Sequence, residues 1–456
     1  MPDSKPRPPL PEGPFCVVGL ARSGQAAARL LAERGERVIG VDSAEPEGAA
    51  ELERAGVEVV LSSDGVAAAA EAGCLIKSPG VPAGTPAIVV ARERGLPVLG
   101  ELELAWRLLA NRFCAVTGTN GKTTVAELLG HIWRGAGEPV AVAGNVGRPL
   151  ASLVGAVEPE ATIVCEASSF QLEDTDAFAP DCGVLLNLTP DHLDRHGTLA
   201  AYLAAKLGMF ANQGNDDVCV YDGSDPQLTG LDLGGCGRRV AFCTEPRLTD
   251  DCGAVIAGGV LELWGEPLLE LSEMALIGPH NHANAAAAAA AAASLGIERE
   301  AIADGLRSFA GVPHRLERVA EVDGVLYVND SKATNVAAAS AALRSFEGGV
   351  HVILGGSLKG GGFAALAAPV AERCRAAYLI GPAAEPLERA LEPAWAAGVE
   401  HGRLDGLEAA VAAAAAAARP GEIVLLAPAC ASFDAFRDFE ARGEAFRAAV
   451  AALGPG

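Results

Sequence analysis

The chain has 456 residues, half of them hydrophobic, and its length corresponds to roughly three domains of about 150 residues each. Its formal net charge of -23 argues against docking on nucleic acid, because binding a phosphate backbone requires a basic surface. The longest apolar runs are the alanine tracts 285–293 and 412–418, which are too short and too weakly hydrophobic to span a membrane, so we expect a cytoplasmic protein.

The first 14 residues are rich in proline and lack the apolar core of a signal peptide. We predict that residues 1–14 form a disordered lead-in. The eleven cysteines contain no C-x-x-C pair, and many lie inside apolar, strand-like runs. We therefore expect them to be small buried side chains in a reducing compartment.

The first predicted domain, residues 15–102, opens with "FCVVGLARSGQAAARLLAERGERVIGVD". This stretch predicts a strand, a turn with Gly19 and Gly24, an amphipathic helix and a second strand that ends in Asp42, as in a dinucleotide-binding unit. The spacing G-x-x-x-x-G lacks the middle glycine that lets a pyrophosphate approach closely. A nicotinamide site, a ribose- or uridine-binding variant of the same sheet, and a plain strand-turn-helix remain open.

The second predicted domain, residues 103–310, contains "CAVTGTNGKTTVAELLG", which predicts a strand, a tight glycine loop and a helix. Gly118 and Gly121 leave room for backbone N–H groups to face phosphate oxygens at the positive helix N-terminus. Lys122 can reach the outer phosphates, and Thr123 offers a hydroxyl to Mg²⁺. The sequence therefore predicts a phosphate-binding loop that is shorter than the usual one.

Three residues downstream are candidates for the same site. Glu166 ends a predicted strand and could hold magnesium, and His192 follows another strand, with Asp191 beside it as an alternative ligand. Lys206 lies on the next predicted helix and is one of only six lysines, whereas arginine is the usual cation of this chain. A retained lysine favours a position that needs a compact or deprotonatable amine.

The third predicted domain, residues 311–456, repeats the alternation of strands and helices, with strands in "GVLYVNDSKATN", "VHVILGGSLKGGG", "AAYLIGP" and "EIVLLAPACAS". Such alternation implies mostly parallel sheets covered on both faces, with ligands beyond the carboxyl ends of the strands. The predicted fold class is therefore α/β, with a Rossmann-like N-terminal domain, a P-loop ATPase-type central domain and a Rossmann-like C-terminal domain.

Eight short motifs follow one another along the chain: "TGTNGKTT", "CEASSFQLE", "TPDHLDRH", "YLAAKL", "HNHAN", "GVPHRLE", "NDSKATN" and "PACASFDAFRDFEARG". Each is modestly specific, but the ordered set closely resembles the family of ATP-dependent Mur ligases over essentially everything after the lead-in. The "SSFQLE" and "DSKATN" runs favour the branch that adds D-glutamate during peptidoglycan precursor synthesis. The "GLARSG" run argues against the branches that add the third residue or the dipeptide.

The resemblance implies an amide-forming ligase that makes an acyl phosphate from ATP. Its substrates would be UDP-N-acetylmuramoyl-L-alanine and D-glutamate, and its cofactors two Mg²⁺ ions, with Mn²⁺ as a substitute, and a CO₂-derived carbamate on Lys206. A carbamate is an oxygen ligand of the kind that Mg²⁺ prefers, whereas an ammonium would repel the ion. A cytoplasmic monomer without nucleic-acid partners is expected.

The resemblance also implies the roles of individual residues. The catalytic positions would be Lys122, Glu166, His192 and Lys206, and the metal ligands Thr123, Glu166, His192 and Lys206. ATP would be bound by Gly118, Thr119, Asn120, Gly121, Lys122, Thr123, Thr124, Asn281, Asn284, Arg315 and Asp330. The UDP-substrate would be bound by Ser23, Asp42, Gly80 and Asn145. D-glutamate would be bound by Lys332, Thr334, Lys359, Ser432, Phe433 and Phe439 of a C-terminal domain that closes over ATP, with His314 at the hinge.

Two departures from the family pattern and three alternatives remain. The chain lacks an arginine after Asp42, and Ser357 stands where an acidic residue often precedes the lysine at 359. A folylpolyglutamate synthase would lack the first domain and the "SSFQLE" run. A nicotinamide-dependent oxidoreductase would use Gly19, Gly24 and Asp42, and a P-loop binding protein without catalysis would bind nucleotide without forming an amide.

Overall fold

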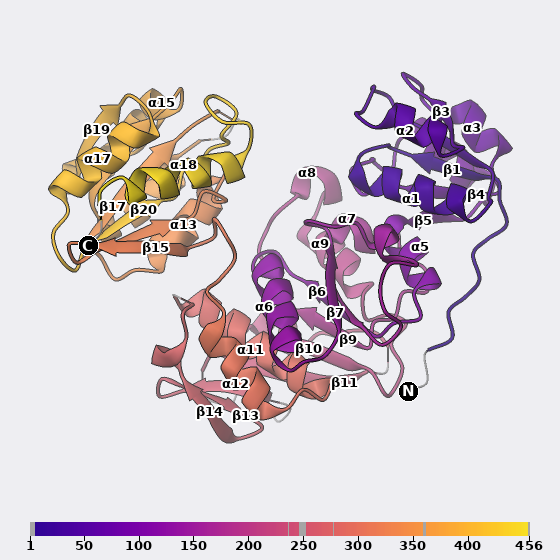
Figure 1. The fold of residues 1–456 in the computed structure, drawn as a ribbon, viewed down its shortest axis with the longest axis horizontal. Helices are drawn as coiled ribbons and strands as arrows, with labels where there is room; N and C mark the ends of the chain where they lie inside the picture. Colours follow the sequence, from indigo (N-terminus) through magenta and orange to yellow (C-terminus); the bar gives the residue numbers. More distant parts are fainter. Residues whose placement is uncertain (1–4, 236, 246–251, 277, 359–361, 455–456) are drawn as a thin grey trace. The chain divides into compact units, whose positions relative to one another are not determined.

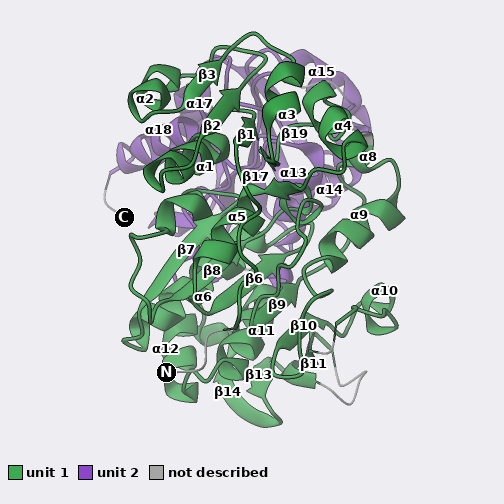
Figure 2. Cartoon of the chain, turned by 90° about the vertical axis from the view of Figure 1, so that its right-hand side faces the viewer, with its two compact units in different colours: residues 1–274, 282–308 green, residues 275–281, 309–456 purple. Residues whose placement is uncertain are grey.

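The computed structural model describes residues 5–235, 237–245, 252–276, 278–358 and 362–454. Three α/β sheets follow one another along the chain (Figure 1), which confirms the predicted fold class. The chain forms two compact units (Figure 2). Residues 1–274 and 282–308 form the first unit, which contains the first two sheets, and residues 275–281 and 309–456 form the second unit with the third sheet.

The first sheet has five parallel strands in the order β3-β2-β1-β4-β5. Phe15 and Val17 of β1 belong to one apolar core and Cys16 and Val18 to another, because successive residues of a strand face opposite sides. The strand order reverses at β1, which is where open α/β sheets bind ligands. The strands are β1 (Phe15–Val18), β2 (Val38–Val41), β3 (Glu58–Val60), β4 (Cys74–Lys77) and β5 (Val98–Gly100), and the helices are α1 (Arg22–Glu33), α2 (Ala49–Arg54), α3 (Val66–Glu71), α4 (Pro86–Glu93) and α5 (Glu101–Leu108).

The second sheet has nine strands in the order β14-β13-β12-β11-β10-β9-β6-β8-β7. Strands β6 to β12 pair in parallel, and β13 and β14 extend the sheet in antiparallel fashion. Since β6 lies between β8 and β9, the ends of these three strands meet at one edge. The strands are β6 (Phe113–Thr117), β7 (Val140–Gly144), β8 (Thr162–Glu166), β9 (Cys182–Leu185), β10 (Val218–Asp222), β11 (Arg238–Cys243), β12 (Cys252–Ala257), β13 (Val260–Leu263) and β14 (Glu266–Glu270).

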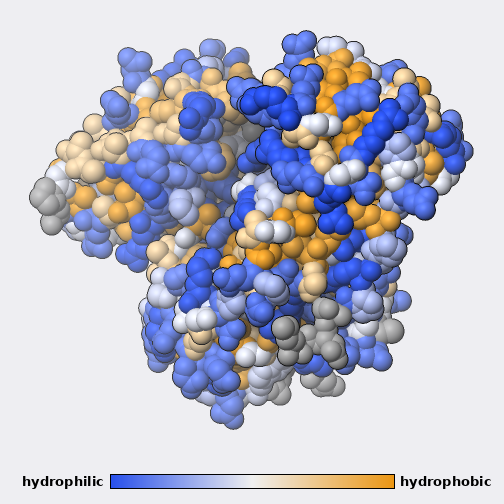
Figure 3. Space-filling view, turned by 45° about the vertical axis from the view of Figure 1, so that its right-hand side comes forward, coloured by the Kyte–Doolittle hydropathy of each residue, from blue (hydrophilic) through white to orange (hydrophobic). Residues whose placement is uncertain are grey.

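The helical segments of this part of the chain are α6 (Lys122–Gly135), η1 (Leu150–Leu153), α7 (Ser169–Leu172), α8 (Leu193–His196), α9 (Leu199–Leu207), α10 (Pro226–Thr229), η2 (Leu271–Glu273), α11 (Pro279–Ser294) and α12 (Arg299–Ser308). The alanine tract of α11 is fully buried from residue 285 to residue 292. The tract is therefore part of the protein interior. Among the described residues, no helix is long and apolar enough to cross a membrane. On the face of the molecule shown in Figure 3, hydrophilic and apolar residues are intermixed.

The third sheet has six strands in the order β15-β16-β20-β17-β18-β19, all parallel except the β15–β16 pair. Apolar cores cover both of its faces. The strands are β15 (Glu317–Val322), β16 (Val325–Asn329), β17 (Val350–Gly355), β18 (Cys374–Ile380), β19 (Glu400–Leu404) and β20 (Ile423–Leu426), and the helical segments are α13 (Val336–Arg344), η3 (Ala364–Leu366), α14 (Ala367–Arg373), α15 (Ala384–Ala390), α16 (Glu392–Ala396), α17 (Leu407–Ala417) and α18 (Phe439–Ala451).

The lead-in differs from the sequence-based prediction over residues 5–14, which are ordered. Lys5 forms an ion pair with Asp217 and donates a hydrogen bond of 3.1 Å to the carbonyl of Ala179. The guanidinium of Arg7 lies 4.0 Å from the centre of the Trp106 ring. These contacts join residues about a hundred or more positions apart, so the local composition of the segment does not reveal them.

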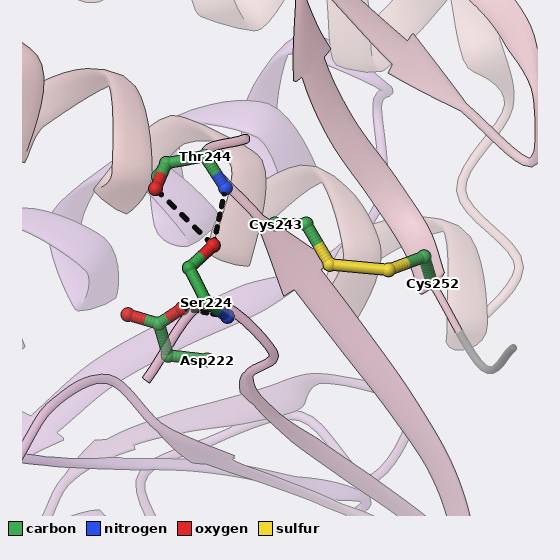
Figure 4. Close-up of a disulfide and its surroundings, with 5 residues drawn as sticks. All are labelled: Asp222, Ser224, Cys243, Thr244 and Cys252. Carbon is green, nitrogen blue, oxygen red and sulfur yellow. Dashed lines mark hydrogen bonds between the residues drawn. A yellow bond between two sulfur atoms is a disulfide. The ribbon is translucent and has the colours of Figure 1, made fainter. Parts of the chain in front are cut away.

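The cysteines largely follow the prediction, with one exception. Seven of the eight free cysteines that the structure describes are buried and Cys374 is partly buried, but Cys243 and Cys252 form a disulfide (Figure 4). Strands β11 and β12 pair side by side and bring these residues together across nine positions of sequence. The expectation that all cysteines are free is therefore wrong for this pair. Beside it, Ser224 accepts a hydrogen bond of 2.8 Å from the backbone N–H of Thr244.

Candidate functional site

The glycine loop joins β6 to α6 and has the conformation that only glycine readily adopts. Gly118 and Gly121 have φ values of 152° and 86°. A Cβ atom at Gly121 would lie 2.3 Å from Oδ1 of Asn284, so no larger residue fits there without displacing this side chain. Asn187, after β9, accepts a hydrogen bond of 2.9 Å from the backbone N–H of Asn120 and donates one of 3.1 Å to its carbonyl. The loop is therefore held from the neighbouring strand.

Lys122 is the first residue of α6, a helix of 14 residues. Its ammonium donates hydrogen bonds of 2.9 Å to the carbonyls of Gly118 and Thr119 and so folds over the loop. Thr123 and Thr124 are buried, and the hydroxyl of Thr124 has no hydrogen-bond partner in the described part of the chain. A helix N-terminus with free N–H groups, a lysine and hydroxyls can bind a phosphate chain.

Lys206 comes from α9 to the other side of the same loop. Its ammonium is buried, donates a hydrogen bond of 2.8 Å to the carbonyl of Gly118, and lies 4.3 Å from the centre of the Tyr202 ring. Burial is the main cause that lowers the pKa of Lys206 to about 7, and the charge of Lys122 acts in the same direction while Asp191 opposes it. The amine can therefore lose its proton near neutral pH.

Glu166 ends β8, beside the end of β6, with Val116 as its partner in the adjacent strand. Its carboxylate is buried and accepts a hydrogen bond of 3.0 Å from the side-chain amide of Asn145. The two residues were predicted to serve different ligands, Glu166 the metal and Asn145 the UDP-substrate. The structure brings them into contact, so these two predicted sites adjoin.

His192 lies farther from its strand than the other candidates, since β9 ends at Leu185. It is half exposed, adopts a left-handed conformation with φ of 51° before α8, and lies beside Phe170 with the two rings tilted by 56° and their centres 4.8 Å apart. Its Nε2 atom lies 3.5 Å from Oδ2 of Asp191, the alternative ligand. No group of three or more His, Cys, Asp or Glu residues that could hold a metal occurs among the residues the structure describes. The predicted set of metal ligands includes Thr123 and Lys206 in addition to Glu166 and His192. This set stays a prediction.

A cavity of about 750 Å³ lies beyond the carboxyl ends of β1, β2 and β4. All four residues predicted to bind the UDP-substrate line it, namely Ser23, Asp42, Gly80 and Asn145. Arg22 and Gln171 also line it, although neither was predicted from the sequence. Arg22 lies in the "GLARSG" run and Gln171 in the "SSFQLE" run, so both were within motifs that had been singled out. Arg22 supplies a positive charge for an anionic ligand.

The unusual glycine spacing of the first domain has a packing explanation. Gly19 turns the chain with φ of 86°, and a Cβ atom at Gly24 would lie 1.8 Å from the carbonyl oxygen of Gly19. Helix α1 therefore packs directly against the turn. The carboxylate of Asp42 accepts hydrogen bonds from the backbone N–H groups of Leu20, at 2.6 Å, and Ala44, at 2.9 Å. Asp42 thus braces the turn beside the cavity.

Several predicted residues of the second unit gather after β16. Asp330 is buried and accepts a hydrogen bond of 3.2 Å from the backbone N–H of Leu316. Burial raises the pKa of Asp330 to about 6, against the opposing influence of Arg315 and, more weakly, Lys332. The Nε atom of Arg315 is buried without a hydrogen-bond partner in the described ranges. A buried carboxylate beside a guanidinium with a free donor can bind a polar ligand.

The remaining predicted residues of this unit differ in exposure. Lys332 lies with its ammonium 5.6 Å from the centre of the Phe439 ring, and its backbone N–H donates to the carbonyl of His314. Ser432 is buried, whereas Phe433 is 71% exposed. The backbone N–H of Thr334 donates to the carbonyl of Lys332, and Asn281 is buried. The prediction for Lys359 lies outside the described residues.

Arg442 of α18 is a further residue that sequence analysis missed. Its buried guanidinium donates hydrogen bonds to Ser331 and to the carbonyls of Cys430 and Ala431. It thus joins the "NDSKATN" and "PACAS" loops, which carry predicted D-glutamate ligands. Burial lowers the pKa of Arg442 to about 10, so it stays charged. Arg442 lies in the "FEARG" run of the last motif, and this was the feature of the sequence that could have indicated its role.

Comparison with protein families matches the three parts of the chain separately. Residues 14–100 match the Mur ligase MurD-like N-terminal domain, residues 116–292 the Mur ligase middle domain, and residues 314–430 the Mur ligase glutamate ligase domain. These three matches together span most of the chain.

Two similar proteins are UDP-N-acetylmuramoylalanine--D-glutamate ligases. The one from Pelotomaculum thermopropionicum is 43% identical over 449 residues, which cover 96% of this chain and 98% of the relative. The one from Acidobacterium capsulatum is 42% identical over 448 residues, which cover 96% of this chain and 95% of the relative.

Two solved structures share the fold at 18% identity. They are the UDP-N-acetylmuramate-alanine ligase MurC of Thermotoga maritima, with a TM-score of 0.60 over 97% of this chain and 100% of that one, and a pseudomurein peptide ligase type C of Methanothermus fervidus, with a TM-score of 0.57 over 96% and 100%. At this level of identity the likeness concerns the fold alone.

Proposed function

The chain belongs to the Mur ligase family, and from this premise we propose that it joins D-glutamate to UDP-N-acetylmuramoyl-L-alanine with hydrolysis of ATP to ADP and phosphate. The observation that carries the proposal is the identity of 43% to a D-glutamate-adding ligase over nearly the whole of both chains. The cavity of the first sheet supports it, because all four residues predicted for the UDP-substrate line it. The reaction is a step of peptidoglycan precursor synthesis, and we place it in the cytoplasm, with the protein as a monomer.

The glycine loop and α6 suit the first half of the reaction. The carboxylate of the alanyl group attacks the γ-phosphorus of ATP, an acyl phosphate forms, and ADP leaves. Lys122 and the N-terminal N–H groups of α6 hold the phosphates in place, and such positioning and charge stabilisation supply most of the catalysis in phosphoryl transfer. Asn281, Asn284, Arg315 and Asp330 hold the rest of the nucleotide in this proposal.

The second half of the reaction forms the amide. The neutral amine of D-glutamate attacks the acyl carbon and a tetrahedral intermediate forms. The nitrogen loses a proton to solvent, and phosphate leaves as the intermediate collapses to the amide. We assign Lys332, Thr334, Lys359, Ser432, Phe433 and Phe439 to the binding of D-glutamate. Arg442 supports this assignment, because it joins the two loops on which Lys332 and Ser432 lie.

The residues around the glycine loop fit Mg²⁺, or Mn²⁺ in its place. We assign two ions to Thr123, Glu166, His192 and a carbamylated Lys206, because a buried carboxylate and a buried, deprotonatable amine occur here. When bound, the ions neutralise the charge of the phosphates. The carbamate forms when the neutral amine of Lys206 bonds to the carbon of CO₂ and its proton leaves to solvent.

Release of phosphate from ATP tests the proposed function. We expect release that requires UDP-N-acetylmuramoyl-L-alanine, D-glutamate and Mg²⁺ together, with a new amide product detected by mass spectrometry. Equal turnover with L-glutamate or with meso-diaminopimelate would overturn the specificity. Phosphate release without any amino acid would show an ATPase and not a ligase.

A further inference from the structure

The guanidinium of Arg195 forms hydrogen bonds to the loop after β4, which lines the cavity. Arg195, on α8 of the central part of the chain, donates a hydrogen bond of 3.0 Å from Nη1 to the carbonyl of Pro79 and one of 3.1 Å from Nη2 to the carbonyl of Val81. These carbonyls lie on either side of Gly80, which lines the cavity. Arg195 therefore fixes the loop at both neighbours of a residue predicted to bind the UDP-substrate.

Arg195 is itself held in place by two contacts. Its Nη2 atom pairs with the carboxylate of Glu173, and its guanidinium lies 4.4 Å from the centre of the Phe170 ring. Its side chain is only 17% exposed. A partly buried guanidinium with a carboxylate and an aromatic face keeps a defined orientation, so its two hydrogen bonds to the loop are directional.

The same cluster holds the start of the loop. Lys77 is the last residue of β4, is fully buried, and pairs with Asp174 and, at 3.4 Å, with Glu173. Two basic and two acidic side chains thus form one charge-balanced network across the first two sheets. Glu173 lies two positions after Gln171, another residue of the cavity wall. The network therefore joins two parts of that wall.

Gly80 itself meets no steric constraint that would shape the loop. A Cβ atom placed on it would have nothing within 4 Å. The loop has one internal hydrogen bond, from the N–H of Val81 to the carbonyl of Ser78 at 3.0 Å. Ser78 anchors the start of the loop, because its N–H donates to the carbonyl of Val18 at 3.0 Å and its hydroxyl to the carbonyl of Gly19 at 2.6 Å. Arg195 holds the two residues on either side of Gly80, beyond this anchor.

We propose that Arg195 is a positioning residue for the nucleoside-diphosphate part of the substrate. It acts through the backbone of residues 79–81 and not by touching the ligand. This inference rests on the proposed function for the identity of the substrate. The expected effect is on the binding of that substrate, so it can be measured without following the reaction.

The test compares variants of Arg195 with a matched control, Arg94→Gln. Arg94 also donates from its guanidinium to two backbone carbonyls of the first domain, those of Ala69 and Ala70, both at 2.7 Å, and it does not line the cavity. Isothermal titration calorimetry would measure the Kd of UDP-N-acetylmuramoyl-L-alanine without ATP, and separately the Kd of ATP. We expect Arg195→Gln to weaken binding of the UDP-substrate about tenfold or more, since two charge-assisted hydrogen bonds are lost, and to change ATP binding less than about twofold. Arg94→Gln should change neither.

Arg195→Lys gives a second, milder test. Lysine keeps the charge beside Glu173 but lacks the planar fork that reaches two carbonyls. We expect its KM for the UDP-substrate to rise severalfold, with kcat and the KM for ATP within about twofold of the wild type. This variant decides the question if Arg195→Gln does not fold.

Wild-type affinity for the UDP-substrate in both Arg195 variants, or in Arg195→Lys alone if Arg195→Gln does not fold, would overturn the positioning role. An equal loss of ATP binding would also overturn it, because the effect would then be a general one on the fold. Failure of the wild-type protein to bind the UDP-substrate would instead contradict the proposed function.

Discussion

The buried ammonium of Lys206 donates a hydrogen bond of 2.8 Å to the carbonyl of Gly118, the first glycine of the loop between β6 and α6. Lys122 bonds to the same carbonyl at 2.9 Å. Two cations therefore share one acceptor, which explains why the charge of Lys122 helps to lower the pKa of Lys206 to about 7, after the larger effect of burial.

Lys206→Ala should lower turnover at least about a hundredfold, because the proposed carbamate oxygens are lost. Formate or acetate in solution should restore part of the activity by supplying oxygens in the space that the side chain leaves. Phosphate-release rates measured with and without the added carboxylate test this expectation.

Lys206→Arg is the matched variant. Arginine stays protonated and cannot form a carbamate, and its bulk leaves no space for an added carboxylate. We expect no activity and no rescue. Wild-type turnover of Lys206→Arg would mean that a permanent cation suffices, and the carbamate would have to be abandoned.

Lys122→Met should also lower turnover at least about a hundredfold while the fold stays intact. Methionine keeps the aliphatic stem and removes the charge proposed to position the phosphates. Circular dichroism would check the fold and phosphate release the activity. Near-normal turnover would show that the loop does not hold the reacting phosphates.

Glu166→Gln separates the charge of Glu166 from its contact with Asn145. Glutamine keeps an oxygen that can accept the hydrogen bond of 3.0 Å from Asn145, but it removes the negative charge proposed to hold Mg²⁺. We expect turnover to fall at least about a hundredfold, with the Kd of the UDP-substrate changed less than about threefold. A large loss of UDP-substrate binding together with normal turnover at saturation would contradict the metal role.

Asp330→Asn should stabilise the protein at pH 8 and weaken ATP binding. Burial raises the pKa of Asp330 from 3.8 to about 6 in the folded protein, so the folded form binds more protons than the unfolded form between these values. Stability is therefore lost as the pH rises through about 6, and a neutral amide avoids this loss.

Thermal unfolding between pH 4 and pH 8 measures the effect. The Tm of Asp330→Asn should exceed that of the wild type at pH 8, and the difference should shrink towards pH 4. Asp405→Asn, which changes an exposed carboxylate of the same unit, should show no such pH dependence. A lower Tm of Asp330→Asn at pH 8 would contradict the unfavourable burial of this charge.

Arg7→Ala should lower the free energy of unfolding by about 1–3 kcal/mol, because the guanidinium loses its contact with the Trp106 ring and its hydrogen bonds to the carbonyls of Leu109 and Asn111. Urea denaturation measures this change. The proposed substrate sites do not include Arg7, so turnover should stay normal. An unchanged free energy of unfolding would mean that the lead-in is disordered in solution, as its composition predicts.

The sequence by itself determined the three α/β sheets and the glycine loop, whereas Ser23, Asp42, Gly80 and Asn145 of the cavity wall were implied by the resemblance to the Mur ligases. The sheets and the loop depend on neighbours in the chain: an apolar strand, a glycine turn and a helix lie within about 30 residues. The carboxyl ends of parallel strands then meet at one edge for geometric reasons, so Glu166 could be placed beside the loop before its contact with Asn145 was known.

The tertiary structure alone decided what depends on residues far apart in the chain. Arg442 bonds to Ser331 across 111 positions, and Arg195 bonds to Pro79 across 116. Both arginines lie in motifs of the sequence, but the motifs do not indicate the residues that they contact. The order of residues 5–14 depends on partners such as Asp217 and Trp106, which lie in the central part of the chain and on α5. Local propensity describes how a segment folds. The partner of a buried charge depends instead on which segments the fold brings together. Burying a charge costs free energy, and only a partner brought close by the fold can offset that cost.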